Sequence, residues 1–424
     1  MGRILLKEAK LNDRSVDILV EGKRIVRIAD HIDSDAAQTI DCKGMYAVAG
    51  FINMHTHSAM TLVRGLCEDS PLKVWLDRIW SVEAFLDHEA IYWGTKLAIL
   101  EMIKTGTTCF LDMYWMADTA SRAALEMGVR AVLTYNFLDN FKEETAQEQK
   151  KACGRLYEFS KSWPDRIRFA TSIHADYTTS QETMQFAKRF ADEHGCVCTA
   201  HLSETLQEVE EDVARYGMRP VAHFEKLGLL DRNMIFAHGV WLDDCEVELL
   251  GKRGVTVVHN INSNLKLASG YRFRYRELRD AGVNVCLGTD GAASSNNLDM
   301  REAMKTMAML QKAWRADPKA MPVDELFEVA TVNGARALGI DAGRIEEGAL
   351  ADIVLIDTKT PEFHPNYNFL GNLVYSANSS CVNTVLIDGR VVMRDRKVEG
   401  EDEIIENADR MAWKLMKLSK NNQK

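Results

Sequence analysis

The sequence lacks the features that would direct the chain into or across a membrane. No uninterrupted run of about 18 apolar residues occurs, so we expect no membrane span. The first residues, MGRILLKEAK, contain no apolar core of a secretion signal, and position 6 is Leu where a myristoylation signal has Ser or Thr. The nine cysteines form no Cys-X-X-Cys pair, and most lie in apolar runs, which is typical of reduced, buried thiols. We therefore expect a cytoplasmic protein.

An excess of basic residues is also absent. The chain has 52 Lys and Arg residues against 62 Asp and Glu residues, and its formal net charge is −10. This balance argues against a nucleic-acid surface, which needs clustered positive charge. The hydrophobic content of 46% is that of an ordinary globular protein. We expect a small-molecule substrate, and neither nucleic acid nor membrane as a partner.

The two ends of the chain share one pattern. Residues 1–48 alternate apolar and polar residues with a period of two, which predicts half-buried antiparallel strands. The same pattern returns after residue 347, in segments such as GALADIVLID. We therefore predict a small β-sandwich domain built from residues 1–49 and 347–424, ending in a helix. In that helix we expect one packed apolar face, made of Ile404, Ile405, Ala408, Met411, Ala412 and Leu415.

The middle of the chain, residues 50–346, repeats a different unit. Short β-branched runs alternate with helical patterns such as residues 87–106 and 180–195. Eight such runs occur, at residues 47–55, 107–114, 130–137, 167–174, 196–203, 234–240, 255–261 and 284–291. Eight strand–helix units in about 300 residues predict an α/β fold of the (β/α)8 TIM-barrel type. A doubly wound sheet is the alternative, but MHTHSAM after the first run lacks the glycine-rich turn of that fold.

Residues of the metal-binding type stand at the ends of these runs. In a barrel of this kind the carboxyl ends of all strands face one rim, where the active site lies. We therefore expect one group of side chains to converge on a single mouth. They are His55, His57, His174, His201, His238, His259 and Asp290.

Four of these residues suit a metal ion. His55 and His57 are two residues apart, so both imidazoles point to the same side of a strand and can bind one ion. With His201 and Asp290 they supply three nitrogens and one carboxylate, a set that suits one divalent metal, zinc first, with iron or manganese as alternatives. Such an ion lowers the pKa of bound water from about 15.7 towards about 7. This set predicts metal-activated hydrolysis.

Other residues near the strand ends are expected to support this chemistry. Glu204 follows His201 by three residues and is poorly placed to bind the metal beside it, so proton transfer is the sharper interpretation. His238 is expected to orient the attacking water or to hydrogen-bond the substrate. His259 and Asp112 are predicted to stand behind the ligands. Any one of these residues alone is compatible with a merely structural role, and no role is assigned to His31, His88, His194, His223 and His364.

Five segments carry a resemblance to a known family. GFINMHTH, AHLSET, FAHGVWL, HNINSNLKLASG and GTDGAASSNN resemble the signature blocks of the amidohydrolase superfamily. Within it, the chain is similar to the 5-methylthioadenosine/S-adenosylhomocysteine deaminases and to related guanine deaminases and triazine hydrolases. The similarity covers almost the whole chain, including the split β domain. The blocks are specific for the superfamily and not for a substrate.

The resemblance implies a hydrolytic deaminase with one metal, usually zinc, held by the four ligands named above. Activated water would attack the amino-bearing carbon of a purine-like ring, and ammonia would leave. Glu204 would protonate a ring nitrogen, while His238 and Asp290 would handle the proton of the water. The implied substrate is an adenosine-type nucleoside: 5-methylthioadenosine, S-adenosylhomocysteine or adenosine.

The resemblance also implies substrate contacts. Glu83 occupies a place where nucleoside deaminases carry a glutamate that binds the ribose hydroxyls, and a solvated glutamate at a helix start is the alternative. His174 matches a position that touches the nucleoside. Trp75 and Trp80 either stack on the substrate or pack in the core.

The chain departs from the family pattern in two respects. Members that accept an amino-acid tail tend to carry an arginine after the third strand, whereas residues 134–145 contain none and Lys142 is the nearest cation. This favours methylthioadenosine or adenosine over S-adenosylhomocysteine. Two prolines common in the blocks are replaced by Ala49 and Ile261, and the second change is expected to reshape the rim near the seventh strand.

Two other functions stay open at this point. One is hydrolysis of another ring, as in deaminases of guanine or another free base, or in a triazine-type chlorohydrolase; some dehalogenating relatives lack the glutamate that this chain has at Glu204. The other is a barrel used only for binding or assembly, which the complete ligand set opposes. Relatives often form assemblies, so a homo-oligomer is a further expectation, although no sequence feature establishes it.

Overall fold

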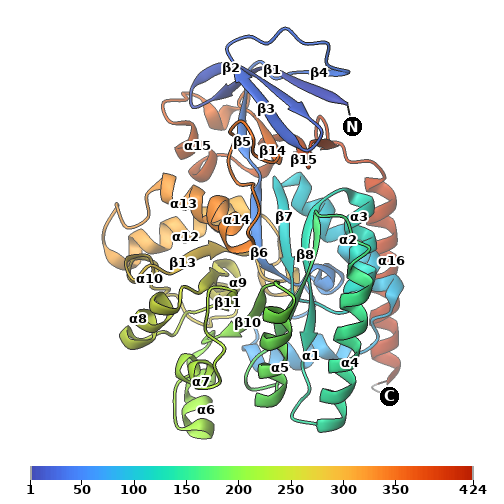
Figure 1. Ribbon diagram of the computed structural model, residues 1–424, viewed down its shortest axis with the longest axis vertical. Helices are drawn as coiled ribbons and strands as arrows, with labels where there is room; N and C mark the ends of the chain where they lie inside the picture. The colour runs from blue at the N-terminus through green and yellow to red at the C-terminus, as the bar shows by residue number, and fades with distance from the viewer. Residues whose placement is uncertain (1, 423–424) are drawn as a thin grey trace.

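A parallel β-barrel forms the larger part of the molecule. The computed structural model describes residues 2–422, and Figure 1 shows the barrel below a smaller sheet. Its eight strands pair in chain order. They are β6 (Phe51–Thr56), β7 (Thr107–Asp112), β8 (Arg130–Phe137), β9 (Ile167–Ile173), β10 (Cys198–Leu202), β11 (Met234–His238), β12 (Thr256–His259) and β13 (Asn284–Leu287). The segment after β13 returns to β6, where Asp290 N donates to His55 O at 3.0 Å. The predicted (β/α)8 barrel is confirmed.

Helices follow each barrel strand. After β6 come η1 (Ser58–Val63), α1 (Leu72–Glu83) and α2 (His88–Lys104); then α3 (Ala117–Met127), α4 (Glu143–Ser160), α5 (Gln181–Glu193), α6 (Leu206–Tyr216), α7 (Pro220–Lys226), α8 (Asp244–Arg253), α9 (Ile261–Lys266), α10 (Tyr275–Asp280), α11 (Ala292–Ser295), α12 (Met300–Arg315), α13 (Val323–Ala330) and α14 (Val332–Leu338). Two predicted helices, residues 87–106 and 180–195, match α2 and α5. Asp87 caps α2 by accepting a hydrogen bond from Ala90 N at 2.8 Å. Gly195 follows α5 with φ at 65°, a backbone conformation that glycine adopts without strain.

Both chain ends build the second sheet. Its strands are β1 (Arg3–Leu11), β2 (Arg14–Glu21), β3 (Arg24–Ala29), β4 (Gln38–Asp41), β5 (Met45–Ala49), β14 (Ile353–Asp357), β15 (Val382–Ile387) and β16 (Arg390–Met393), with η2 (Pro361–Phe363), α15 (Phe369–Tyr375) and η3 (Ser379–Cys381) between β14 and β15. The order is β16-β15-β14-β5-β1-β2-β3, and β4 pairs with β1. Ile25 N in β3 donates a hydrogen bond to Ala349 O, just before β14, at 3.0 Å, so the segments from the two chain ends also meet at this edge of the sheet. They enclose a shared core that includes Leu6, Ile18 and Leu355. The predicted β-sandwich from both chain ends is confirmed.

The first predicted strand, residues 47–55, spans two sheets. Ala47 to Ala49 belong to β5, which pairs with β14 in the terminal sheet, and the barrel begins only at Phe51. Gly50 separates the two strands, and a Cβ there would lie 2.2 Å from the Thr108 side chain. The continuous apolar run hides this boundary, because residues on both sides of it are buried.

A buried ion cluster joins the two sheets. Arg130 opens β8, and its guanidinium lies 2.8 Å from Asp352 and 3.1 Å from Asp388. The three side chains are at most 6% exposed. Because Arg130 stands at the start of its strand, the terminal sheet lies against the amino ends of the barrel strands. The carboxyl ends are therefore left for a functional site.

We expect Arg130→Met to lower the free energy of unfolding by about 3–5 kcal/mol, because both carboxylates would stay buried without a partner. The matched control is Arg14→Met, which removes a 2.8 Å ion pair with Asp30 whose side chains are 73% and 79% exposed. We expect a loss below about 1 kcal/mol for this control. Urea denaturation followed by circular dichroism measures both, and equal losses in the two variants would contradict the prediction.

The C-terminal helix α16 (Glu401–Asn422) packs along α2 and α1 on one side of the barrel (Figure 1). Ile404, Ala408, Met411 and Leu415 are buried, as predicted. Ile405 is 47% exposed, so its assignment to the packed face was wrong. One residue corresponds to about 100° of helix rotation, which turns Ile405 away from the partner helices.

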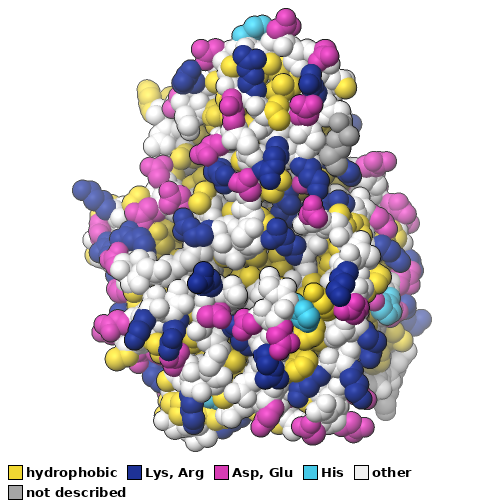
Figure 2. Space-filling view, viewed as in Figure 1, with side chains coloured by type: hydrophobic (Ala, Val, Ile, Leu, Met, Phe, Trp, Pro, Cys, Tyr) yellow, Lys and Arg dark blue, Asp and Glu magenta, His cyan; other side chains and the backbone are white. Residues whose placement is uncertain are grey.

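The surface and the thiols agree with an ordinary globular chain. Figure 2 shows acidic and basic side chains interspersed over the drawn face. All nine cysteines are free, and six of them are buried, as expected for most of them. No helix among residues 2–422 combines the length and the apolar character that crossing a bilayer requires.

Candidate active site

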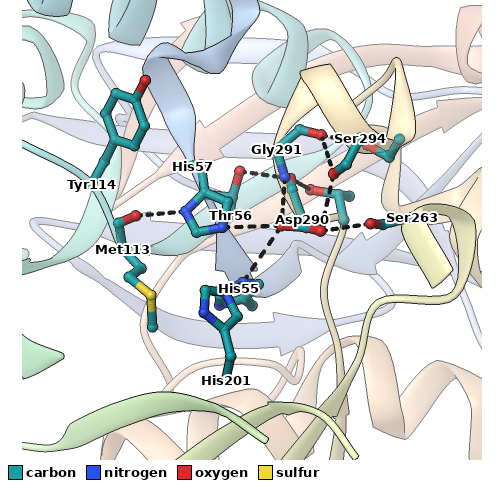
Figure 3. Close-up of polar contacts among 12 residues, drawn as sticks. His55, Thr56, His57, Met113, Tyr114, His201, Ser263, Asp290, Gly291 and Ser294 are labelled. Carbon is teal, nitrogen blue, oxygen red and sulfur yellow. Dashed lines mark hydrogen bonds and ion pairs between the residues drawn. The ribbon is translucent and has the colours of Figure 1, made fainter. Parts of the chain in front are cut away.

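Four side chains meet at the carboxyl end of the barrel (Figure 3). His55 and His57 come from β6, His201 comes from β10, and Asp290 follows β13. Asp290 Oδ1 lies 3.1 Å from His57 Nε2 and 3.6 Å from His55 Nε2. His201 Nε2 lies 3.2 Å from His55 Nε2. Residues 235 positions apart in sequence thus share one small volume, at the place where the strand ends predicted it.

Two of the imidazoles are oriented by backbone carbonyls. His57 Nδ1 lies 2.6 Å from Met113 O, and His201 Nδ1 lies 2.6 Å from His174 O. A carbonyl only accepts, so each Nδ1 carries a proton and each Nε2 faces the centre of the cluster as the atom that could bind a metal. Such partners behind a ligand fix its tautomer and its direction.

Asp290 is held by three donors besides the histidines. Its Oδ2 accepts from Ser263 Oγ at 2.6 Å and from Ser294 Oγ at 3.0 Å, and its Oδ1 accepts from Gly291 N at 2.9 Å. Burial raises the pKa of this carboxyl, but hydrogen bonds to His55 and His57 outweigh it and hold the pKa well below its usual range. The side chain is therefore a fixed carboxylate at neutral pH.

The imidazoles differ in charge. Burial lowers the pKa of His55 to about 4 and holds the pKa of His201 well below its usual value, so both are neutral at pH 7. Burial also opposes the charged form of His57, but the hydrogen bond and charge of Asp290 raise the pKa of His57 to about 9. His57 and Asp290 therefore form an ion pair, in which a bound cation would take the place of the proton on His57 Nε2.

The donor set fits a first-row divalent ion. One ligand atom from each of His55, His57 and His201 lies within 4.8 Å of the others, and the same holds for His55, His238 and Asp290. Three imidazole nitrogens and one carboxylate oxygen are the ligands that zinc and its neighbours prefer. His238 stands at the edge of this set, close enough to touch a group bound there.

Glu204 and His238 lie beside the cluster. Glu204 Oε2 is 3.6 Å from His238 Nε2, and Glu204 Oε1 accepts from Ser269 Oγ at 3.1 Å. Asn264 Nδ2 lies 2.9 Å from His238 Nδ1 and sets the direction of that ring. Burial raises the pKa of Glu204, which is the direction that a proton donor requires.

A cavity of about 590 Å³, open solvent at its mouth included, opens over these residues. Helix α1 covers one side of it with Leu72, Trp75, Leu76, Trp80 and Glu83. The remaining wall includes His57, Tyr114, Asn136, His174, Tyr177, His201, Glu204, His238, Leu267 and Asp290. The wall thus combines apolar and aromatic side chains with convergent titratable groups, as is typical of small-molecule sites.

Glu83 and His174 both face this cavity. Glu83 ends α1 and accepts a hydrogen bond from Tyr114 Oη, while burial raises the pKa of Glu83. The alternative of a solvated glutamate at a helix start is therefore wrong. Trp80 lines the wall with its ring 6.2 Å from that of His174, whereas Trp75, at 4% exposure, both lines the wall and packs in the core.

Other predicted residues lie outside the cluster. Asp112 accepts from Ser58 N and Ser58 Oγ, both at 2.7 Å, and so fixes the backbone directly after His57. His259 ends β12 but stacks on Phe273 with ring centroids 3.9 Å apart, and it does not line the cavity. Lys142 is exposed at the start of α4 and does not line the cavity either.

The sequence reasoning missed several residues that shape the site. Asp290 is held by Ser263, His238 by Asn264, and Glu204 by Ser269, as described above. All three lie in the block HNINSNLKLASG, whose small polar residues between apolar ones were the available signal. Tyr114 follows Asp112 at the end of β7 and had no signal beyond that position.

A parallel barrel with three imidazoles and a carboxylate at its carboxyl mouth defines the class of metal-dependent barrel hydrolases. The model of the amidohydrolase family matches residues 46–392, and the chain belongs to that family. The family is metal-dependent, and the fold and the donor set described above agree with it.

Curated relatives and solved structures agree with this assignment. The chain is 45% identical to a 5-methylthioadenosine/S-adenosylhomocysteine deaminase of Thermococcus onnurineus, over 90% of each chain. It is 42% identical to a 5'-deoxyadenosine deaminase of Methanoregula boonei, over 98% of this chain and 95% of that one. An adenosine deaminase structure from Xanthomonas campestris with bound zinc has a TM-score of 0.92 at 33% identity, over 98% of each chain. A zinc-bound atrazine chlorohydrolase structure from Arthrobacter aurescens has a TM-score of 0.89 at 21% identity, over 96% of this chain and 100% of that one.

Proposed function

We propose that the protein is a metal-dependent hydrolytic deaminase of an adenosine-type nucleoside and releases ammonia from the purine ring. The observation that carries the proposal is the placement of Glu204 and His238 against the His55, His57, His201 and Asp290 set, in one cavity with Glu83. A proton donor, a hydrolytic centre and a sugar contact then meet around a space suited to a ring. The relatives named for adenosine-type substrates support this choice.

The proposed cofactor is one zinc ion held by His55, His57, His201 and Asp290. When bound there, it supplies water with a pKa lowered from about 15.7 towards about 7. A zinc-bound structural neighbour at 33% identity supports zinc over iron or manganese.

The protein residues move the protons. Glu204 donates a proton to the ring nitrogen beside the amino-bearing carbon, because its pKa is raised and its carboxyl faces the cavity. His238 and Asp290 take the proton of the attacking water and pass it to the amino group. The carbon–nitrogen bond breaks, ammonia leaves, the oxygen stays on the ring as a carbonyl, and the second proton of the water returns to Glu204.

The walls favour a nucleoside with a small 5′ group. Glu83 accepts hydrogen bonds from ribose hydroxyls in place of the Tyr114 hydroxyl, and Trp80 and His174 cover the base. No arginine lines the cavity among the described residues. Lys266 lies on the outer rim, 2.8 Å from Glu68, so its charge is already paired. The described cavity wall itself offers a carboxylate tail no lysine or arginine, and Lys73 and Lys266 stand only on the outer rim, which favours 5-methylthioadenosine, 5'-deoxyadenosine or adenosine over S-adenosylhomocysteine.

Ammonia release from a substrate panel tests the proposal. The zinc-loaded protein is given 5-methylthioadenosine, 5'-deoxyadenosine, S-adenosylhomocysteine, adenosine, adenine, guanine and a chlorinated triazine. We expect turnover of the adenosine derivatives, with S-adenosylhomocysteine the slowest of them. Turnover of only a free base or the triazine would overturn the nucleoside assignment.

We expect Glu83→Gln to lower kcat/KM for 5-methylthioadenosine by about 10- to 100-fold, because a hydrogen bond to a charged group is worth about 1.5–3 kcal/mol. Steady-state kinetics with 2′,3′-dideoxyadenosine supply the control, since this substrate has no hydroxyls for Glu83 to bind. The variant and the wild type should then differ by less than about threefold. An equal loss on both substrates would show that Glu83 does not sense the ribose.

A further inference from the structure

A second group of metal-type residues lies away from the active-site cluster. Asp176 stands in the loop after β9, Asp212 is on α6, and His223 is on α7. Helices α6 and α7 lie together at the lower edge of the molecule in Figure 1. All three side chains are 1% exposed. Three segments thus bring two carboxyls and one imidazole into a place without water access.

The polar atoms of this group are unpartnered. One ligand atom from each residue lies within 4.8 Å of the other two, and His223 Nδ1 is 3.8 Å from Asp176 Oδ2. Within residues 2–422, no hydrogen bond satisfies either Asp176 carboxyl oxygen, Asp212 Oδ2 or His223 Nδ1. A buried polar atom without a partner costs about 1–3 kcal/mol, and more if charged. Four such atoms facing one another indicate a shared ligand.

The imidazole is aimed by its neighbours. The His223 ring stacks on Tyr216, with centroids 3.8 Å apart and planes 26° apart. Its Nε2 lies 3.0 Å from Gln181 Nε2, the nitrogen of that side-chain amide. The amide nitrogen donates to Nε2, so in the neutral ring Nδ1 carries the proton and faces Asp176 Oδ2 at 3.8 Å. A cation bound at Nδ1 would move this proton to Nε2 and turn the amide so that its oxygen accepts it. Stacking on Tyr216 holds the ring so that Nδ1 points towards Asp176.

Basic side chains do not neutralise the carboxylates. No ion pair from Lys or Arg reaches Asp176 or Asp212 in the described part of the chain. Arg215, on the same helix as Asp212, lies over the rings of Phe141 and Tyr216 at 5.2 and 5.8 Å instead. Two buried carboxylates without a counter-ion are too costly to persist, so a cation or a proton must accompany them.

We propose that Asp176, Asp212 and His223 form a second binding site for a first-row divalent cation. Both Asp176 oxygens are free, so this carboxylate can bind through two atoms, which gives four protein ligand atoms in total. Two carboxylates and one imidazole neutralise the charge of a divalent ion and satisfy every unpartnered atom of the group. The site is independent of the reaction assigned to the active site.

The site would tie α6 and α7 to the barrel near the active site. Glu208, also on α6, accepts hydrogen bonds from Ser203 N at 2.6 Å and from Glu204 N at 2.7 Å. Asp176 stands two residues after His174, which lines the cavity. An ion shared by Asp176 and Asp212 therefore fixes the helix that positions the backbone of Glu204.

A single proton shared by the two carboxyls is the competing occupant. Burial and the neighbouring Asp176 carboxyl raise the pKa of Asp212, which is compatible with a protonated group in the absence of metal. If the two carboxyls share one proton, His223 Nδ1 and one Asp176 oxygen remain without a hydrogen-bond partner. A bound cation contacts both of these atoms. Metal counting separates the two occupants.

The test is the metal content of the full-length protein loaded with Zn2+, and separately with Mn2+, and then desalted. Inductively coupled plasma mass spectrometry should find two equivalents in the wild type and one in Asp212→Asn. Glu211→Gln, which changes an exposed neighbour on the same helix, should keep two equivalents. His201→Ala should hold one equivalent, because it removes a ligand of the active-site set and leaves the second site intact.

The Tm provides a second way to distinguish a bound cation from a shared proton. The wild type should gain Tm on adding Zn2+ beyond the first equivalent, and Asp212→Asn should not. His223→Gln is the second variant if Asp212→Asn does not fold, and it too should hold one equivalent. One equivalent in the wild type, or an unchanged count with an unchanged or higher Tm in Asp212→Asn, would overturn the proposal in favour of a shared proton.

Discussion

Replacing Glu204 with glutamine is expected to lower kcat/KM for deamination by about 1,000-fold, within the range of about 100- to 10,000-fold for general acid–base groups. The amide keeps the volume and the hydrogen bond from Ser269 Oγ, but it cannot give a proton to the ring nitrogen. Because Glu204 is not part of the four-residue ligand set, the metal content should stay at the wild-type value. The loss should fall on kcat, since the amide still occupies the same part of the cavity wall.

Steady-state ammonia release from 5-methylthioadenosine measures this effect, with metal content determined on the same preparation. Glu211→Gln is the matched control, because it makes the same chemical change on the exposed face of the neighbouring helix. We expect the control to stay within about twofold of the wild type. Wild-type kcat in Glu204→Gln would remove Glu204 from proton transfer.

Replacing Asp290 with asparagine should have an effect of at least the same size and of a different kind. Asp290 is the one carboxylate of the ligand set, and it also balances the positive charge of His57. An amide supplies no charge, so metal is lost on desalting and kcat/KM falls by about 10,000-fold, the effect of several kcal/mol of metal-supplied activation.

The control for Asp290→Asn is Ser294→Ala, which removes one donor to Asp290 Oδ2 and leaves Ser263 in place. Loss of a partner behind a ligand typically costs about 10- to 100-fold in metal affinity or activity. We therefore expect metal content and kcat/KM to fall in a graded series, from the wild type through Ser294→Ala to Asp290→Asn. Full metal occupancy and activity in Asp290→Asn would exclude Asp290 from the ligand set.

The barrel and most of its mouth were predictable because both depend on one local rule. Parallel strands place their last residues on one rim, so His55, His201 and Asp290 could be brought together before any coordinates were known. Glu204 was predictable from its three-residue offset past His201. These inferences need only strand ends and spacing, which the hydropathy pattern supplies.

Other features needed three-dimensional contacts. Gly50 divides one apolar run between two sheets, and both sides of the division are buried, so periodicity carries no mark of it. His259 ends a strand as the ligands do, yet its ring stacks on Phe273 in the segment between α9 and α10 and does not line the cavity. His223 was assigned no role from its helical position, although it faces two buried carboxyls that stand 47 and 11 residues before it in the sequence.

The most direct test of the central claim is the fate of solvent oxygen. The zinc-loaded protein is incubated with 5-methylthioadenosine in water enriched in ¹⁸O, and the ammonia and the purine product are quantified together. Hydrolytic deamination at this site predicts one ammonia per product and one ¹⁸O atom on the ring carbon that lost nitrogen. Product without ammonia, ammonia without ring label, or no turnover by the metal-loaded protein would contradict the account.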